Sequence, residues 1–273
     1  MREEKNFSEK PIQRLAVVKE ANLLISLSDA YVSLHNLQNH RLIERLECTK
    51  GAAHIAVTST VASGTETHAP SLISRLAVSV KRKVLCWHWQ DTELAPGIIE
   101  INLDATVRSL SWADGTRLVA GTDPGFSIID VTTGRVRPIY KPAVRTATDI
   151  DPGKRVGVRF GAVRSSGMGF VGMGGWVPKP MATRLTGNNI LLAKDVNSLF
   201  TSSDGEALEK RQVPWATAPD AIGCSYPYLL ALQSSDAGVV QVWNPDTLSL
   251  LQTVSVPGAA FLHVQQPGTS TPG

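Results

Sequence analysis

A cysteine and a histidine two residues apart, framed by tryptophans, form the strongest candidate for chemistry in this sequence. The stretch KVLCWHW places Cys86 and His88 at alternate positions, so in a β-strand both side chains would share one face. A thiolate and an imidazole can both bind zinc, but zinc normally takes at least three protein ligands, and no second pair with suitable spacing occurs. Because Trp87 and Trp89 occupy the other face, the pattern favours a strand packed on both sides, and we expect no metal site here.

Three consecutive cations, Lys81, Arg82 and Lys83, come directly before this strand, where we expect a tight turn. A solvated turn accounts for them without any function. The alternative is an exposed basic edge that docks an acidic partner protein, because charged loops on a rigid scaffold often carry binding. These three residues are therefore candidates for a partner surface.

A glycine-rich segment, RVGVRFGAVRSSGMGFVGMGGWVPKP, spans residues 155–180 and contains seven glycines. Glycine packs nothing and weakens strands, so we expect an inter-strand loop within an insertion at about residues 143–183. The segment lacks the spacing of a phosphate-binding loop. Its apolar centre with basic flanks makes Phe170, Trp176 and Lys179 candidates for contact with a partner protein or an anionic membrane. A passive linker, or a loop that folds back on the domain, are the alternatives.

The composition indicates a globular protein and excludes several functional classes. The net charge is only +3 over 273 residues, which argues against a dedicated nucleic-acid binder. Cys48, Cys86 and Cys224 are far apart and form no C-x-x-C pair, so we expect an intracellular, reducing compartment. No signal peptide, apolar membrane span, G-x-S-x-G or H-E-x-x-H motif occurs, and we expect no catalytic residues, no metal and no cofactor.

Short apolar runs recur along the chain, each followed by a turn rich in Asn, Asp, Gly, Pro or Thr and then by a second run. This pattern is typical of β-hairpins. If Val84, Phe126, Ser198 and Val240 are equivalent positions, the intervals between them are 42, 72 and 42 residues, and the glycine-rich segment lengthens the middle one. An earlier hairpin begins at Tyr31, 53 residues before Val84. A period near 42 residues is typical of four-stranded propeller blades.

Two further β-rich runs precede each hairpin, as a four-stranded blade requires. Examples are IQRLAVV and NLLISLS before Tyr31, and TVRSLSWA and TRLVAGT before Phe126. We therefore predict an all-β fold, an incomplete β-propeller of about five blade-like units of antiparallel strands. It should occupy residues 1–264 and be followed by a loop-like tail at residues 265–273.

Several segments resemble a known family. KRKVLCWHW is similar to the lysine-rich, aromatic strand of the citron homology (CNH) domain, a propeller of Rab-effector and tethering proteins. The N-terminal region resembles the vacuolar morphogenesis protein six / vacuolar protein sorting thirty-nine family. The residues that carry this likeness are Asn6, Phe7, Ser8, Leu24, Ser26, Leu27, Tyr31, Val32, Lys50, Gly51 and Ala52. SWADGTRLVAGTDPGFSIID resembles the next blade of that family, and the likeness covers residues 5–142 and 184–264.

The resemblance implies a non-enzymatic interaction domain in a subunit of the tether called HOPS, which captures membranes at the late endosome and vacuole. The implied partners are a late-endosomal Rab GTPase and other subunits, the latter through an α-solenoid that follows the domain in family members. The implied location is cytoplasmic and peripheral on the vacuole or late endosome, with links to autophagy. Two alternatives stay open: the related CORVET subunit with an early-endosomal Rab, and a CNH regulatory domain of a kinase or Rho exchange factor.

Overall fold

The computed structural model describes residues 10–62, 71–139, 179–208, 211–233 and 238–258. Within these ranges the chain forms strands and two three-residue 3₁₀ turns, Glu47–Thr49 and Thr186–Asn188, and contains no α-helix. The expected tail and most of the expected insertion, residues 143–178, lie outside the described residues.

The strands form five antiparallel sheets in chain order. The first sheet comprises β1 (Ile12–Val18), β2 (Leu23–Ser28), β3 (Tyr31–Asn36) and β4 (Leu42–Leu46). The second comprises β5 (Ala52–Ala62), β6 (Ser71–Val80), β7 (Lys83–Gln90), β8 (Glu93–Leu94) and β9 (Ile99–Asn102), where β8 and β9 both pair with β7. The third comprises β10 (Val107–Trp112), β11 (Arg117–Thr122), β12 (Gly125–Asp130) and β13 (Val136–Ile139).

The last two sheets repeat the plan. The fourth comprises β14 (Met181–Arg184), β15 (Asn189–Lys194) and β16 (Asn197–Ser202), and an isolated bridge joins Thr201 to Ala207 where a fourth strand would pair. The fifth comprises β17 (Ala221–Ser225), β18 (Tyr228–Gln233), β19 (Val239–Trp243) and β20 (Leu250–Ser255).

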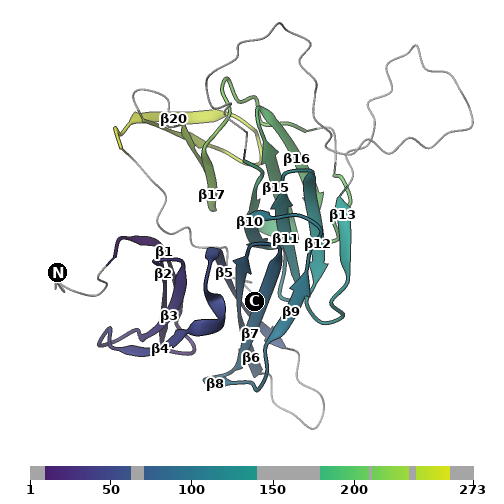
Figure 1. The fold of residues 1–273 in the computed structure, drawn as a ribbon. Helices are drawn as coiled ribbons and strands as arrows, with labels where there is room; N and C mark the ends of the chain where they lie inside the picture. The colour runs from purple at the N-terminus through teal and green to yellow at the C-terminus, as the bar shows by residue number, and fades with distance from the viewer. Residues whose placement is uncertain (1–9, 63–70, 140–178, 209–210, 234–237, 259–273) are drawn as a thin grey trace, which may run out of the picture.

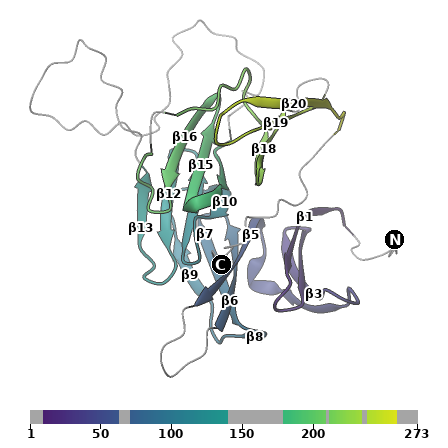
Figure 2. The same ribbon diagram turned by 180° about the vertical axis from the view of Figure 1, so that it is seen from behind.

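The sheets are arranged as the blades of a propeller. Their first strands contact one another in sequence, β1 with β5, β5 with β10, β10 with β14, and β14 with β17. Figure 1 shows the five sheets following one another along an arc, with the first and last sheets at its two ends, and Figure 2 shows the same order from behind. The predicted all-β propeller of five antiparallel units is confirmed.

The repeat read from the sequence corresponds to real structural equivalence. Tyr31, Val84, Phe126, Ser198 and Val240 all lie in the third strand of their sheets, namely β3, β7, β12, β16 and β19. The predicted hairpins therefore join the third and fourth strands, and the two runs before each hairpin form the first and second strands.

The core lies between the blades, so each internal sheet is packed on both faces. Strand β7 illustrates this, because Leu85, Trp87 and Trp89 join a buried cluster with the first sheet. Val84 and Cys86 join a separate buried cluster with the third sheet. The alternation predicted for this strand is confirmed, and burial of both faces explains why it reads as a nearly continuous apolar run.

Candidate functional site

In every sheet, the first strand begins at the same end of the propeller. Because neighbouring strands are antiparallel, the turn between the second and third strands of each sheet lies at that end as well. We call this end the turn face. Its tight turns are Asp29–Ala30, Lys81–Arg82, Asp123–Pro124 and Asp195–Val196. Strand β13 also ends here, since Ile139 pairs with Phe126. Lys179 precedes β14 at this face, so the described chain before and after the insertion borders the same surface as the basic turn.

The basic turn is exposed and is fixed to the neighbouring connection by its main chain. The backbone N–H groups of Leu103 and Val107 donate hydrogen bonds to the carbonyls of Arg82 (2.8 Å) and Lys81 (2.9 Å). Lys81 and Arg82 form the turn itself, and within the described chain their side chains make no ion pair. The position predicted for Lys83 was wrong in one respect. It is the first residue of β7, and its Nζ forms an ion pair with Glu100 Oε1 at 2.5 Å across the β7–β9 pairing.

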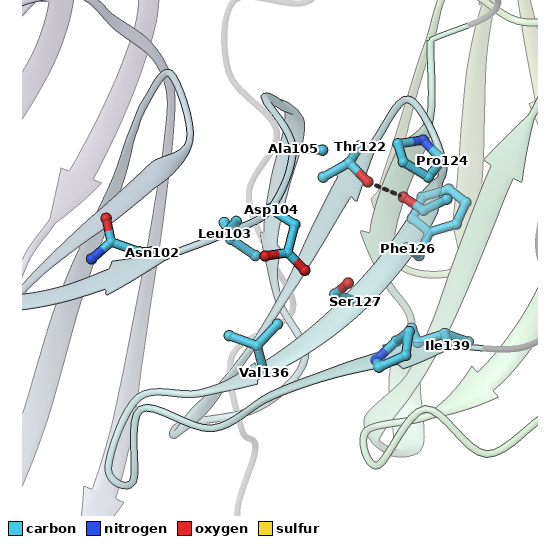
Figure 3. Close-up of a pocket in the computed structure, with 12 residues that line it drawn as sticks. Asn102, Leu103, Asp104, Ala105, Thr122, Pro124, Phe126, Ser127, Val136 and Ile139 are labelled. Carbon is cyan, nitrogen blue, oxygen red and sulfur yellow. Dashed lines mark hydrogen bonds between the residues drawn. The ribbon is translucent and has the colours of Figure 1, made fainter.

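A hollow of about 380 Å³ lies beside the basic turn, between the second and third sheets (Figure 3). It is lined by Asn102, Leu103, Asp104, Ala105, Thr122, Pro124, Gly125, Phe126, Ser127, Val136, Pro138 and Ile139. Figure 3 shows the Asp104 carboxylate directed toward Ser127, while the Thr122 hydroxyl donates a hydrogen bond to the Gly125 carbonyl at 3.0 Å. Most of the lining residues are apolar and Asp104 supplies the one carboxylate among them, so this lining offers binding rather than acid–base catalysis.

Ion pairs neutralise part of the turn face. Arg108 forms a bidentate pair with Asp123, with Nε to Oδ1 and Nη2 to Oδ2 both at 3.0 Å. This hydrogen-bonded guanidinium lowers the pKa of the Asp123 carboxyl. Lys194 donates from Nζ to the main-chain carbonyl of Asp123 at 2.5 Å. These contacts occupy Arg108 and Lys194, whereas Lys81 and Arg82 make no ion pair with any residue that the structure describes.

Cys86 and His88 do not form a reactive pair. Burial raises the pKa of the Cys86 thiol to about 12, so the nucleophilic thiolate is scarce at neutral pH. His88 lies on the same strand, opposite Arg75 in the pairing with β6. The described part of the chain holds no group of three or more His, Cys, Asp or Glu side chains suited to a metal ion.

Thiol chemistry checks this arrangement. Burial also raises the pKa of Cys224, to about 11, whereas Cys48 is exposed. We expect an aromatic disulfide reagent at neutral pH to label Cys48 in the native chain and to label Cys86 and Cys224 only after unfolding. A Cys48→Ser variant should then lose the native signal. Rapid native labelling of Cys86 would contradict the packed-strand interpretation.

The candidate partner-surface residues divide into two groups. Lys81, Arg82, Lys83 and Lys179 are exposed at the turn face. Phe170 and Trp176 lie outside the described residues. The sequence did not indicate the hollow, since its lining comes from the β9–β10 connection of one sheet and from β12 and β13 of the next. No local pattern in the sequence distinguishes Asp104, which lines the hollow, from Asp130, whose carboxylate accepts turn hydrogen bonds from the Thr132 and Thr133 N–H groups.

None of the described residues forms a helix that is long and apolar enough to cross a membrane.

Comparison with known proteins identifies the family. The CNH domain matches residues 3–265. Vacuolar morphogenesis protein 6 of Schizosaccharomyces pombe is 20% identical over 92% of the chain and 24% of its own length. Vacuolar sorting protein 39 of Arabidopsis thaliana is 23% identical over 91% of this chain and 20% of its own length. The Vam6/Vps39-like protein of Homo sapiens is 21% identical over 84% of this chain and 21% of its own length. The chain thus spans a quarter or less of the length of these relatives.

A solved structure agrees on the fold. The AfRom2 CNH domain superposes with a TM-score of 0.53 at 18% identity, covering 93% of this chain and 74% of that one. The repeat, the five antiparallel sheets and the match over nearly all residues lead to one conclusion: the chain belongs to the CNH domain family, and its curated homologues are Vam6/Vps39 proteins.

Proposed function

We propose that this chain is the non-enzymatic interaction domain of a HOPS-type tethering subunit and that its turn face contributes to binding a late-endosomal Rab GTPase. The observation that carries the proposal is the similarity to Vam6/Vps39 proteins over 84–92% of the chain. The names of these relatives place them in vacuolar morphogenesis and sorting. The proposed location is peripheral, on the cytoplasmic side of the vacuole or late endosome.

The turn face has the features that a docking surface needs. Lys81 and Arg82 offer two exposed cations that form no ion pair with a described residue. Two hydrogen bonds hold the main chain of their turn, so the backbone gains little order on binding. The adjacent hollow supplies apolar area next to the charges. Complementary charge steers association and selects partners, whereas buried apolar contacts hold the complex. Contact of Phe170 and Trp176 with the same partner stays a prediction.

Charge reversal tests the proposal. Lys81→Glu combined with Arg82→Glu should weaken binding of the late-endosomal Rab by about tenfold or more, since close charge pairs at interfaces contribute on the order of 1.5 kcal/mol or more. Binding of the Rab, loaded with a GTP analogue, to the immobilised chain gives the measurement. The matched control is Arg41→Glu with Arg135→Glu, which reverses two exposed cations directly before β4 and β13, at the end of the sheets opposite the turn face.

The outcomes separate the alternatives. Equal loss with both double variants would show a general electrostatic effect and would count against the turn face. Selective binding of an early-endosomal Rab would instead support the CORVET alternative.

A further inference from the structure

The hollow between the second and third sheets contains a carboxylate that the described chain leaves unused. Asp104 lines the hollow and is exposed, and it forms no hydrogen bond and no ion pair with any described residue. Other carboxylates of this region are engaged. Glu100 pairs with Lys83, and Asp123 pairs with Arg108. Asp104 is therefore available to a charged group from outside the chain.

The loop that carries Asp104 is held at both ends. The backbone N–H of Leu103 donates to the Arg82 carbonyl at 2.8 Å, and that of Val107 donates to the Lys81 carbonyl at 2.9 Å. Leu103 and Val107 are also buried in the cluster between the second and third sheets. The carboxylate therefore projects from a backbone of fixed position, which reduces the entropy that is lost when a ligand binds.

The facing wall of the hollow comes from one face of the third sheet. Ser127 pairs with Pro138, and Ile129 pairs with Val136. Paired residues and residues two apart share a face, so these four side chains lie on the same side of the sheet. Ile129 is buried against the second sheet, and hence this face is directed toward Asp104. Figure 3 shows the Asp104 carboxylate directed toward Ser127, so carboxylate and wall meet in one space between two blades.

This lining disfavours several kinds of ligand. A metal ion takes several ligands, and the described residues contain no suitable group of three or more His, Cys, Asp or Glu side chains. A partner strand would pair with the outer edge of β13, but Pro138 in that strand has no N–H to donate. An apolar wall that faces one carboxylate suits a long side chain with an apolar stem and a cationic end. The volume of about 380 Å³ lies within the range of small-ligand pockets.

We propose that the hollow receives an arginine side chain of the partner protein. Its aliphatic stem lies against Val136 and Pro138, and its guanidinium pairs with Asp104. Arginine suits this site better than lysine, because the guanidinium is planar, weakly hydrated and able to bond both carboxylate oxygens at once. Lys81 and Arg82 border the site, so the partner should present acidic residues beside the arginine. The proposal rests on the proposed function only in assigning the arginine to the partner bound at the turn face.

A peptide titration of the 273-residue chain tests the hollow directly. The probe is acetyl-glycyl-arginyl-glycine amide, and the readout is the NMR chemical shifts of the Val136 methyl groups and the Ser127 amide. We expect saturable shift changes, and none with a matched peptide in which citrulline, which has the same shape but no charge, replaces arginine. Asp104→Asn should abolish the changes. Asp195→Asn, which removes an exposed carboxylate from the β15–β16 turn of the same face, should retain them.

Three results of the titration would overturn the proposal: no response at Val136 and Ser127, equal shift changes with the citrulline peptide, or an unchanged response in Asp104→Asn. A stronger response to the corresponding lysine peptide would overturn the choice of arginine.

Binding of the late-endosomal Rab separates this inference from the proposed function. Asp104→Asn should weaken that binding by about threefold or more, the effect of one exposed ion pair, whereas Asp195→Asn should leave it unchanged. If the Rab binds and is indifferent to Asp104→Asn, the assignment of the arginine to this partner fails and the proposed function stands. If the Rab does not bind at all, the proposed function fails, and the peptide titration alone decides whether the hollow takes an arginine.

Discussion

Replacing Trp112 with alanine should lower the free energy of unfolding by about 3–5 kcal/mol, the range typical of large aromatic side chains removed from cores. Trp112 is fully buried in the cluster between the second and third sheets. Its indole also donates the 3.0 Å hydrogen bond to the Ala56 carbonyl, which would be left buried without this donor. Urea denaturation followed by far-ultraviolet circular dichroism gives the measurement.

Trp112→Phe provides the control, because it keeps an aromatic ring in the same place but removes the N–H donor. We expect this variant to lower the free energy of unfolding by about 1–3 kcal/mol, which is less than the alanine variant does. The free energy of unfolding of Trp112→Ala could instead lie within about 1 kcal/mol of that of the unmodified chain, a difference typical of surface substitutions. The packing between these two blades would then contribute less than the structure indicates.

Replacing Asp114 with alanine is the second change with a large expected effect, about 2–4 kcal/mol of unfolding free energy. Its Oδ1 accepts hydrogen bonds from the backbone N–H groups of Thr116 and Arg117, both at 2.8 Å, and its Oδ2 accepts from Arg117 Nε at 2.6 Å. Arg117 continues to the fourth sheet, where it contacts Ser203 Oγ at 3.1 Å and Asp204. The carboxylate therefore closes a turn and anchors a link between two blades.

Two further cations depend on the same carboxylate. Burial lowers the pKa values of Arg75 and Arg184, and the charge of Asp114 acts in the opposite direction on both. Arg184 is only 5% exposed, so removing Asp114 would leave a buried guanidinium with less compensation.

Asp114→Asn separates the two roles of this side chain. It keeps the Oδ1 acceptor of the turn but removes the charge, and it should cost clearly less than alanine. Urea denaturation of both variants at the same pH decides. If both variants lower the free energy of unfolding equally, the charge of Asp114 alone accounts for its contribution. A small decrease with alanine would contradict the role of Asp114 as an anchor.

Much of the fold could be predicted because its signals are local and repeated. Turn residues and alternating runs recur at a fixed spacing, and this was enough to place Tyr31, Val84 and Val240 in third strands. The faces of β7 followed from strand alternation alone. Lys83 was misplaced by one residue, since a run of three cations gives no indication of where a two-residue turn ends and pairing begins.

The candidate sites were harder to predict because they form between blades. Asp104 borders the hollow only because the third sheet packs beside the β9–β10 connection.

We propose that the turn face of this CNH propeller contributes to binding a late-endosomal Rab GTPase. The most direct measurement is the dissociation constant of the immobilised chain for that Rab, in its GTP-analogue and GDP forms, with and without Lys81→Glu and Arg82→Glu. We expect binding that favours the GTP-analogue form and weakens by about tenfold or more in the double variant, while Arg41→Glu with Arg135→Glu leaves it unchanged. Binding that is insensitive to charge reversal at the basic turn, or no binding of either nucleotide form, would contradict it.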